Sequence, residues 1–412
     1  MPGARCSAIS TTFATQPKVS AYNTTKAKMS EQEKGIVENF EEGEPTGIEE
    51  ESPDPSNEIF PIERPFDPDK IKIVRETKTI SLICTRIDHE EIDLAPEFQR
   101  RARIWDAARK GRLIESILLR IPLPVFYVAS DNRDAWSVVD GLQRLTTIHD
   151  FLKGLFPLKG LEYLAQFDEK SFMDLPRNMQ RRIEETELVM NVIQPGTPEE
   201  VMFNIFSRIN TGGMTLNSQE IRHALNKGPV RQFLADLIKT DAFQEATKGS
   251  VSDVRMSARE CALRFVAFHL VSWSSYRNND LDGFLNAAMK SVNDSSTSER
   301  NSIRESFDKA MRAAAEIFED DAFRKRYRAD APRSPISKAL FETWSVTLAA
   351  LSSAELRTLY ERKEHVRALF MQTLAEDRDF EVSISYATGV PGRVRKRFET
   401  VELIVKKVLS NA

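Results

Sequence analysis

The chain of 412 residues is longer than one hydrophobic core usually serves, so two folded units are expected. Its 58 lysines and arginines against 62 aspartates and glutamates give a net charge of −4, which excludes a global polycation that binds nucleic acid by charge alone. Three scattered cysteines fit a reducing cytoplasm better than a disulfide framework, and no apolar stretch approaches the ~20 residues of a membrane-spanning helix, so no membrane partner is expected.

Residues 1–70 are expected to be disordered. Residues 1–28 hold four basic residues and no acidic one, which is the composition of a transit peptide or of an unstructured start upstream of Met29. Residues 31–63 carry twelve acidic residues and a single basic one, Lys34, with Pro and Gly interspersed. Such a segment cannot bury enough apolar surface to offset the conformational entropy that it loses on ordering.

A small mixed α+β domain is expected over residues 71–228. Apolar residues three and four positions apart predict its helices, and short runs of β-branched and aromatic residues predict its strands. In chain order these are a helix carrying Ile80, Ile83 and Ile87, an extended run at 92–94, a helix carrying Leu113, Ile114, Ile117 and Leu118, strands at 125–128 and 136–139, and a helix carrying Leu142, Leu145, Ile148 and Leu152.

Two further helices are predicted from their capping residues. Thr197 is followed by Pro198 and, three residues after the cap, by Glu200, and Asn217 is followed in the same way by Glu220. From residue 229 to 412 the sequence is mostly amphipathic helix, with helices predicted at 258–273, 302–318, 335–351 and 354–375. The fold class is therefore α+β: the mixed domain is followed by a mainly α-helical domain over residues 229–412.

The sequence DGLQR, residues 140–144, stands between a predicted buried strand and an apolar helix. The first turn of such a helix has unpaired N–H groups and the positive end of the helix dipole, which favour an anion. Gly141 permits a tight turn and a close ligand, and Arg144 offers a planar fork for phosphate oxygens. Asp140 suits a phosphate-bound magnesium ion or the orientation of a water, and Gln143 suits positioning a water or a base edge.

A purely structural interpretation of this pentapeptide also stands. Aspartate is a common N-cap residue, so Asp140 would then cap the helix and Arg144 would be a solvated surface residue.

Four blocks of sequence occur in a specific order. They are PEFQRRARIW (96–105), LIESILLRIPLPVFYV (113–128), VVDGLQRLTTI (138–148) and FSRINTGGMTLNSQEIRHAL (206–225). Together they resemble the family typified by the N-terminal part of GmrSD, a restriction enzyme that acts on modified DNA. The resemblance extends from about Ile80 to Leu225 and, more weakly, to RVRKRF (393–398).

The resemblance implies a ParB/sulfiredoxin-type fold and hydrolysis of a nucleoside triphosphate that powers or licenses DNA restriction in phage defence. It also implies which residues form the nucleotide site. These are Asp140, Gln143 and Arg144 as catalytic residues, Asp140 also as the metal ligand, and Gln99, Arg100, Gly141, Arg208 and Asn210 as nucleotide-binding residues. For the residues at positions 99, 100, 208 and 210, a purely structural role is the alternative interpretation.

One departure from the family's DGQQR motif leaves the activity open, because its first Gln is Leu142 here. Leu142 shares an apolar stripe with Leu145, whereas Arg144 lies about 200° away around the helix, so the change is either a packing substitution or the loss of a water-positioning group. In the second case the chain would hydrolyse nucleotide slowly or not at all. The alternatives are then a non-catalytic ParB-like DNA-binding module, or a regulatory subunit that docks a separate nuclease.

A basic cluster near the C-terminus is the predicted DNA contact. Its members are Arg393, Arg395, Lys396 and Arg397. We expect these residues to contact DNA phosphates. The alternative is that they form an ordinary solvated face of a helix.

Overall fold

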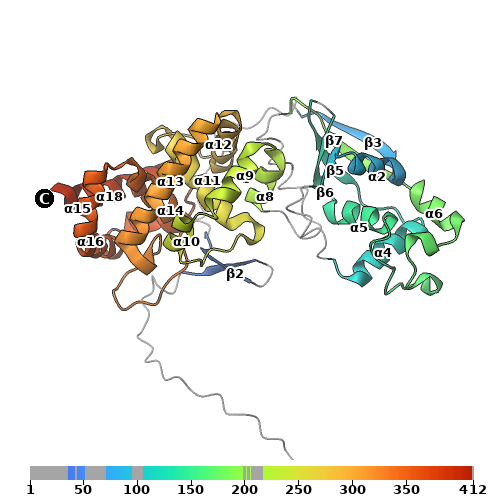
Figure 1. Ribbon diagram of the computed structural model, residues 1–412, viewed down its shortest axis with the longest axis horizontal. Helices are drawn as coiled ribbons and strands as arrows, with labels where there is room; N and C mark the ends of the chain where they lie inside the picture. Colours follow the sequence, from blue (N-terminus) through green and yellow to red (C-terminus); the bar gives the residue numbers. More distant parts are fainter. Residues whose placement is uncertain are drawn as a thin grey trace, which may run out of the picture. The chain divides into compact units, whose positions relative to one another are not determined.

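The computed structural model describes residues 36–41, 44–51, 71–94, 105–132, 134–197, 201, 205 and 217–410. These residues form a mixed α+β part followed by a mainly helical part, which confirms the predicted fold class (Figure 1). None of the described helices is both long and apolar enough to span a bilayer.

A five-stranded sheet organises the α+β part. Its strands are β3 (Ile73–Thr79), β4 (Ile92–Asp93), β5 (Phe126–Ser130), β6 (Trp136–Asp140) and β7 (Glu187–Ile193), in the spatial order β3-β7-β5-β6-β4. β4 is parallel to β6, whereas β5 is antiparallel to β6. The C-terminal ends of β4 and β6 therefore lie at the same end of the sheet as the N-terminal end of β5, and DGLQR begins there.

Helices cover both faces of this sheet. On one face are α2 (Ile80–Asp88), α4 (Ala107–Leu118) and α5 (Leu142–Leu152), with α6 (Arg177–Glu184) packed on α4. They pack on the inward residues of the strands, such as Phe126, Val128 and Trp136. The alternate residues, among them Val139, pack on Ile221 of α8 (Ser218–Leu225) on the opposite face. This alternation is what a strand with a period of two residues produces.

The predicted elements of this part are confirmed, but two strands were missed. β3 is an edge strand in which Ile73 and Val74 are 41% and 46% exposed, so it lacks the alternation that predicts a strand. β7 does alternate, with Leu188, Met190 and Val192 buried, so its signal was present in the sequence. Asn217 and Glu220 form the predicted capping box. The helix predicted to begin at Thr197 lies mostly outside the described residues.

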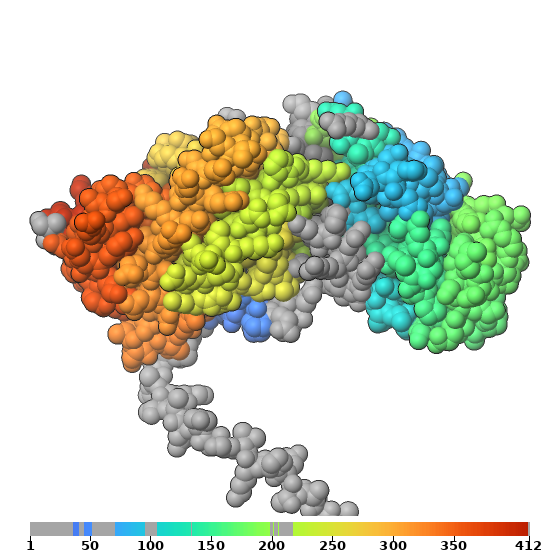
Figure 2. All heavy atoms as spheres, in the orientation of Figure 1, coloured from blue at the N-terminus to red at the C-terminus, as the bar shows by residue number. Residues whose placement is uncertain are grey.

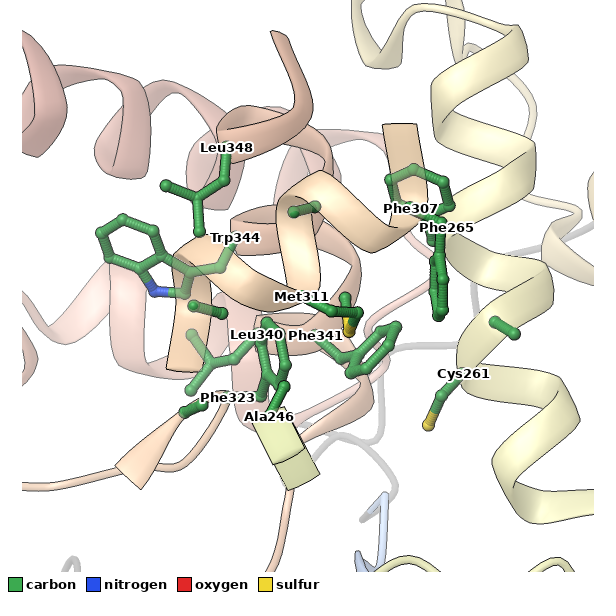
Figure 3. Close-up of a cluster of buried hydrophobic side chains, with 14 of the residues drawn as sticks. Ala246, Cys261, Phe265, Phe307, Met311, Phe323, Leu340, Phe341, Trp344 and Leu348 are labelled. Carbon is green, nitrogen blue, oxygen red and sulfur yellow. The ribbon is translucent and has the colours of Figure 1, made fainter. Parts of the chain in front are cut away.

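The helical part has its own core of aromatic and aliphatic side chains. Figure 3 shows Phe265, Phe307, Phe341 and Trp344 pointing into it from three helices. The helices are α9 (Pro229–Leu237), α10 (Asp241–Thr247), α11 (Ser257–Leu270), α12 (Leu281–Asp294), α13 (Thr297–Phe318), α14 (Lys338–Ala350), α15 (Ser353–Glu361), α16 (Lys363–Glu376), α17 (Arg378–Ser385) and α18 (Pro391–Ser410).

The single helix predicted at 354–375 is wrong. Its range holds two helices, α15 and α16, which are separated at Arg362, whose backbone has φ −113° and ψ 22°. Leu359 and Val366 are both buried, so the change of direction lets each helix place its own apolar stripe on the core.

The expectation of disorder is wrong for residues 36–41 and 44–51. They form a hairpin of β1 (Glu38–Glu41) and β2 (Glu44–Glu49) that packs against the helical part (Figure 2, dark blue). Ile48 is fully buried in the helical core, and Glu49 and Glu51 pair with Lys325 and Arg264. The composition argument held that the segment has too little apolar surface to order itself, but the core that receives Ile48 and the basic partners of Glu49 and Glu51 lie more than 200 residues away in the sequence.

Buried His223 of α8 gives a test of the packing at this helix. The side chain is 1% exposed, and burial together with the charges of Arg231 and Arg259 lowers its pKa to about 3. The folded state therefore holds a neutral imidazole well below the pH at which the unfolded chain becomes protonated.

We expect the stability that His223 contributes to be complete above pH 6.5 and to be lost as the pH falls toward 3. The free energy of unfolding should fall by at most about 1.4 kcal/mol per pH unit on its account, because one proton is taken up on unfolding. Urea unfolding between pH 7 and 4.5 measures this slope. The exposed control His365→Gln should retain it; a His223→Gln variant with an equally steep slope would contradict the assignment.

Candidate functional site

The junction of β6 and α5 is built around Gly141. β6 ends at Asp140, Gly141 adopts the left-handed conformation with φ +96°, and α5 begins at Leu142. A Cβ atom at position 141 would lie 2.3 Å from Cδ1 of Phe126, much closer than two carbon atoms can approach. Glycine is thus required both by the backbone conformation and by the neighbouring ring.

The Arg144 guanidinium is held on the start of β5. Its Nη2 lies 3.0 Å from Oδ2 of Asp140 and donates to the Val125 carbonyl at 3.2 Å, and its Nη1 donates to the Pro124 carbonyl. Its Cζ lies 4.2 Å from the centre of the Phe126 ring, a cation–π distance. Burial lowers the pKa of Arg144 and the Asp140 carboxylate raises it, with a net lowering.

Asp140 and Arg144, the two charged residues of the motif, differ in their exposure to solvent. The Arg144 side chain is only 12% exposed, so the freely solvated residue of the structural interpretation is not what is observed. Asp140 is 31% exposed, and its carboxylate is reachable from solvent at the end of β6. The arrangement can present a carboxylate to a ligand in a direction fixed by the adjacent guanidinium.

The first turn of α5 is the second part of the site. Glycine has no side chain that could cap the helix, so Gly141 supplies no capping bond to the backbone N–H groups of this turn. Leu142 is half-buried and packs on the apolar cluster beneath the sheet, as its stripe with Leu145 predicted. Gln143 is half-buried on the same turn.

A magnesium ion fits Asp140 only together with other ligands. Among the described residues there is no group of three His, Cys, Asp or Glu side chains that could hold a metal. Mg²⁺ is commonly held by one or two carboxylates, with the remaining positions filled by substrate phosphates and water. The partly exposed Asp140 carboxylate suits such a shared site.

Four of the predicted nucleotide-binding residues, Gln99, Arg100, Arg208 and Asn210, lie outside the described residues. β4, which precedes residues 95–104, ends at the same end of the sheet as Asp140.

Phe126 and the carbonyls of residues 124 and 125 are functional groups that sequence reasoning missed. An aromatic residue inside a predicted strand is most simply a core residue, and Phe126 is indeed 1% exposed. Its contact with Arg144 joins residues 18 positions apart, so no local pattern could reveal it.

The predicted DNA contact is wrong for Arg397. Its side chain is fully buried, pairs with the equally buried Glu342 and donates to the carbonyls of Ser383 and Thr388. The four basic residues belong to α18, and the helical period places position 397 on the face that also buries Val394, Phe398 and Val401. Lys396 Nζ lies 2.7 Å from Asp377 Oδ2, Arg393 donates to the Tyr386 carbonyl, and Arg395 is exposed.

Comparison with known families agrees with the sequence blocks. Residues 82–226 match the family described as "GmrSD restriction endonuclease, N-terminal domain". The matched span runs from α2 to α8 and contains the Asp140–Arg144 junction, so the expected resemblance is confirmed for this part of the chain. No curated protein matches the chain. The matched domain links the protein to restriction systems.

The burial of Arg397 gives a test that separates stability from DNA binding. Arg397→Met should lower the free energy of unfolding by about 3 kcal/mol, because Glu342 loses one partner inside the core. Arg395→Met, on the exposed face of the same helix, should stay within about 0.5 kcal/mol. Urea unfolding measures both. An Arg397→Met variant that keeps its stability but loses affinity for DNA would restore the original prediction.

Proposed function

We propose that this chain, whose residues 82–226 match the GmrSD N-terminal domain family, binds a nucleoside triphosphate with Mg²⁺ at the Asp140–Arg144 junction and hydrolyses it within a DNA-restriction, phage-defence system. The observation that carries the proposal is a partly exposed carboxylate at a strand end, directly followed by a left-handed glycine and by a helix without a side-chain cap.

Phosphate oxygens have natural partners at the start of α5. The helix is 11 residues long, long enough for a dipole whose positive end lies at Leu142. Backbone N–H groups of its first turn would donate to an anion placed at this end of the helix. This is the same chemistry by which other glycine-led helices receive phosphates.

Asp140 supplies the group that a bare phosphate site would not need. Its carboxylate would hold Mg²⁺ on the phosphates or orient the attacking water. Arg144, 3.0 Å away, fixes the direction of this carboxylate, while Gln143 on the same turn can donate to or accept from a water. Arg144 thus acts first as a positioning residue, since several of its N–H groups already bond to the protein.

The packing of Leu142 supports the reading that the departure from DGQQR is a packing substitution. The side chain packs on the apolar cluster that also contains Leu145 and Ile148. Hydrolysis is therefore proposed despite the missing Gln. DNA is proposed as a further partner because the matched family is described as a restriction endonuclease, and a separate nuclease subunit is proposed beside it.

The Asp140 carboxylate is tested by Asp140→Asn. Phosphate release from ATP, GTP, CTP and UTP with Mg²⁺ should fall roughly 100-fold for the nucleotide that the wild type prefers, because the charge that holds metal or water is removed. Asparagine keeps an oxygen that accepts from Arg144, so the stability should change little.

The matched control is Asp134→Asn, which removes a carboxylate just before the opposite end of the same strand, where Asp134 pairs with Arg86. It should leave phosphate release unchanged. Equal release by wild type and Asp140→Asn would remove the catalytic role. If no triphosphate produces heat in calorimetry with the wild type, the binding proposal itself fails.

Leu142→Gln tests the departure from the family motif. We expect it to lower the free energy of unfolding by about 1 kcal/mol, because a polar group replaces an apolar contact. Phosphate release should remain within roughly threefold of the wild type, since position 142 faces the packed side of α5. A rise of about 100-fold would instead identify a water-positioning role for Gln at this position.

A further inference from the structure

The segment Thr46–Glu51 lies in the helical part in the manner of a bound peptide. Its backbone forms a short ladder with residue 336: the Glu49 N–H donates to the Ile336 carbonyl at 2.8 Å, and the Ile336 N–H donates to the Gly47 carbonyl at 2.8 Å. On its other side the Ser252 N–H donates to the Thr46 carbonyl at 3.0 Å. Main-chain addition of one strand is a common mode of peptide recognition.

Two small features fix the register of this segment. Gly47 has φ +73°, and a Cβ atom there would lie 1.8 Å from the carbonyl oxygen of Ser250, so only glycine lets the two backbones meet. The next residue, Ile48, has no exposed surface and enters the core that contains Phe265 and Phe341. The apolar anchor and the close backbone approach are therefore adjacent in the sequence.

Two acidic residues that follow, Glu49 and Glu51, contact basic side chains of the helical part. Glu49 lies 2.5 Å from Lys325 Nζ, which also donates to the Ser385 hydroxyl at 2.7 Å. Glu51 accepts from Arg264 at 3.1 Å and from the Thr388 hydroxyl at 3.0 Å. Lys325 and Arg264 are 4% and 2% exposed with the segment in place. Arg264 also pairs with Glu260 and Glu342, so the segment supplies part of the negative charge that balances these two cations.

The pKa values of the two glutamates are shifted in opposite directions. Burial raises the pKa of Glu51, but the charges of Arg264 and Lys338 outweigh it and the net pKa is lowered. For Glu49, burial outweighs the charge of Lys325 and the pKa is raised. Glu51 is therefore the carboxylate whose ionised form the groove favours.

Chain length does not force the segment into this position. Residues 52–70 connect it to β3 and can extend over roughly 60 Å, at about 3.3 Å per residue. The contacts described above would be the same if the segment were a separate molecule.

We propose that the helical part carries a peptide-docking groove, formed by Ser250–Ser252, Arg264, Lys325 and Ile336, and that residues 46–51 of this chain are its separable ligand. The groove recognises an extended acidic peptide of the pattern Thr-Gly-Ile-Glu-x-Glu. A peptide fits better than a nucleic acid, because the apolar anchor and the main-chain ladder have no counterpart in a phosphate backbone. The proposal is independent of the nucleotide site.

The test uses the full chain with a protease site inserted within residues 52–70. After cleavage, the N-terminal fragment should co-elute with the rest of the protein. A fluorescent synthetic peptide of residues 36–51, in excess, should displace it, which fluorescence anisotropy detects. The Gly47→Val peptide should bind at least about 50-fold more weakly, and the Ile48→Asp peptide likewise. The matched control, Phe40→Ser, changes a residue that is 61% exposed and should bind within about threefold of the wild-type peptide.

Three results would overturn the proposal. The first is a fragment that dissociates on cleavage while the labelled peptide does not bind. The second is a fragment that no excess of peptide displaces within a day at 37 °C, which would make it an integral part of the fold. The third is displacement by a DNA oligonucleotide, with Gly47→Val peptide binding as well as wild type, which would identify a polyanion site.

Discussion

The contact of Arg144 with the start of β5 is the constraint on which the candidate site depends. Strand pairing aligns β5 and β6 from Tyr127 and Asp140 onward, but the residues just before β5 have no ladder to hold them. Arg144 supplies that hold by bonding the carbonyls of Pro124 and Val125 and by lying on Phe126. The same guanidinium orients Asp140, so the position of this carboxylate depends on how the end of the sheet is packed.

The helical part depends on a comparable arrangement of buried charges. Glu342, fully buried, accepts from both Arg264 and Arg397, and Arg264 also pairs with Glu260 and Glu51. Removing one member of such a set leaves an uncompensated charge in the core, which costs more than the net worth of the pair. This network, together with the apolar core of Figure 3, explains how a helical part so rich in charged residues can be compact.

The sequence predicted most elements whose pattern is local, with β7 missed despite its alternation, and gave no signal where the partner is distant. The apolar stripes of α2, α4 and α5, the capping box at Asn217 and the strands flanking DGLQR follow from spacing within a dozen residues. β3 is an edge strand with exposed apolar residues, and the hairpin at 36–51 is ordered by cations far along the chain, so neither has a local signature. In the site, Gly141 and Asp140 were predictable from motif position. The role of Phe126 was not predictable, because in the sequence a ring that holds a guanidinium cannot be distinguished from any other core ring.

The hairpin of residues 36–51 has a consequence for the order in which the protein matures. It leaves the ribosome early, yet Lys325, which pairs with Glu49, is 276 positions further along. At synthesis rates of about 5–20 residues per second, this separation corresponds to a wait of on the order of 14–55 seconds. During that interval Ile48 and the acids beside it have no groove to enter, while the sheet that follows them can already form. The hairpin is thus synthesised before the helices that it contacts, and its residues are among the last of those described to reach their native contacts.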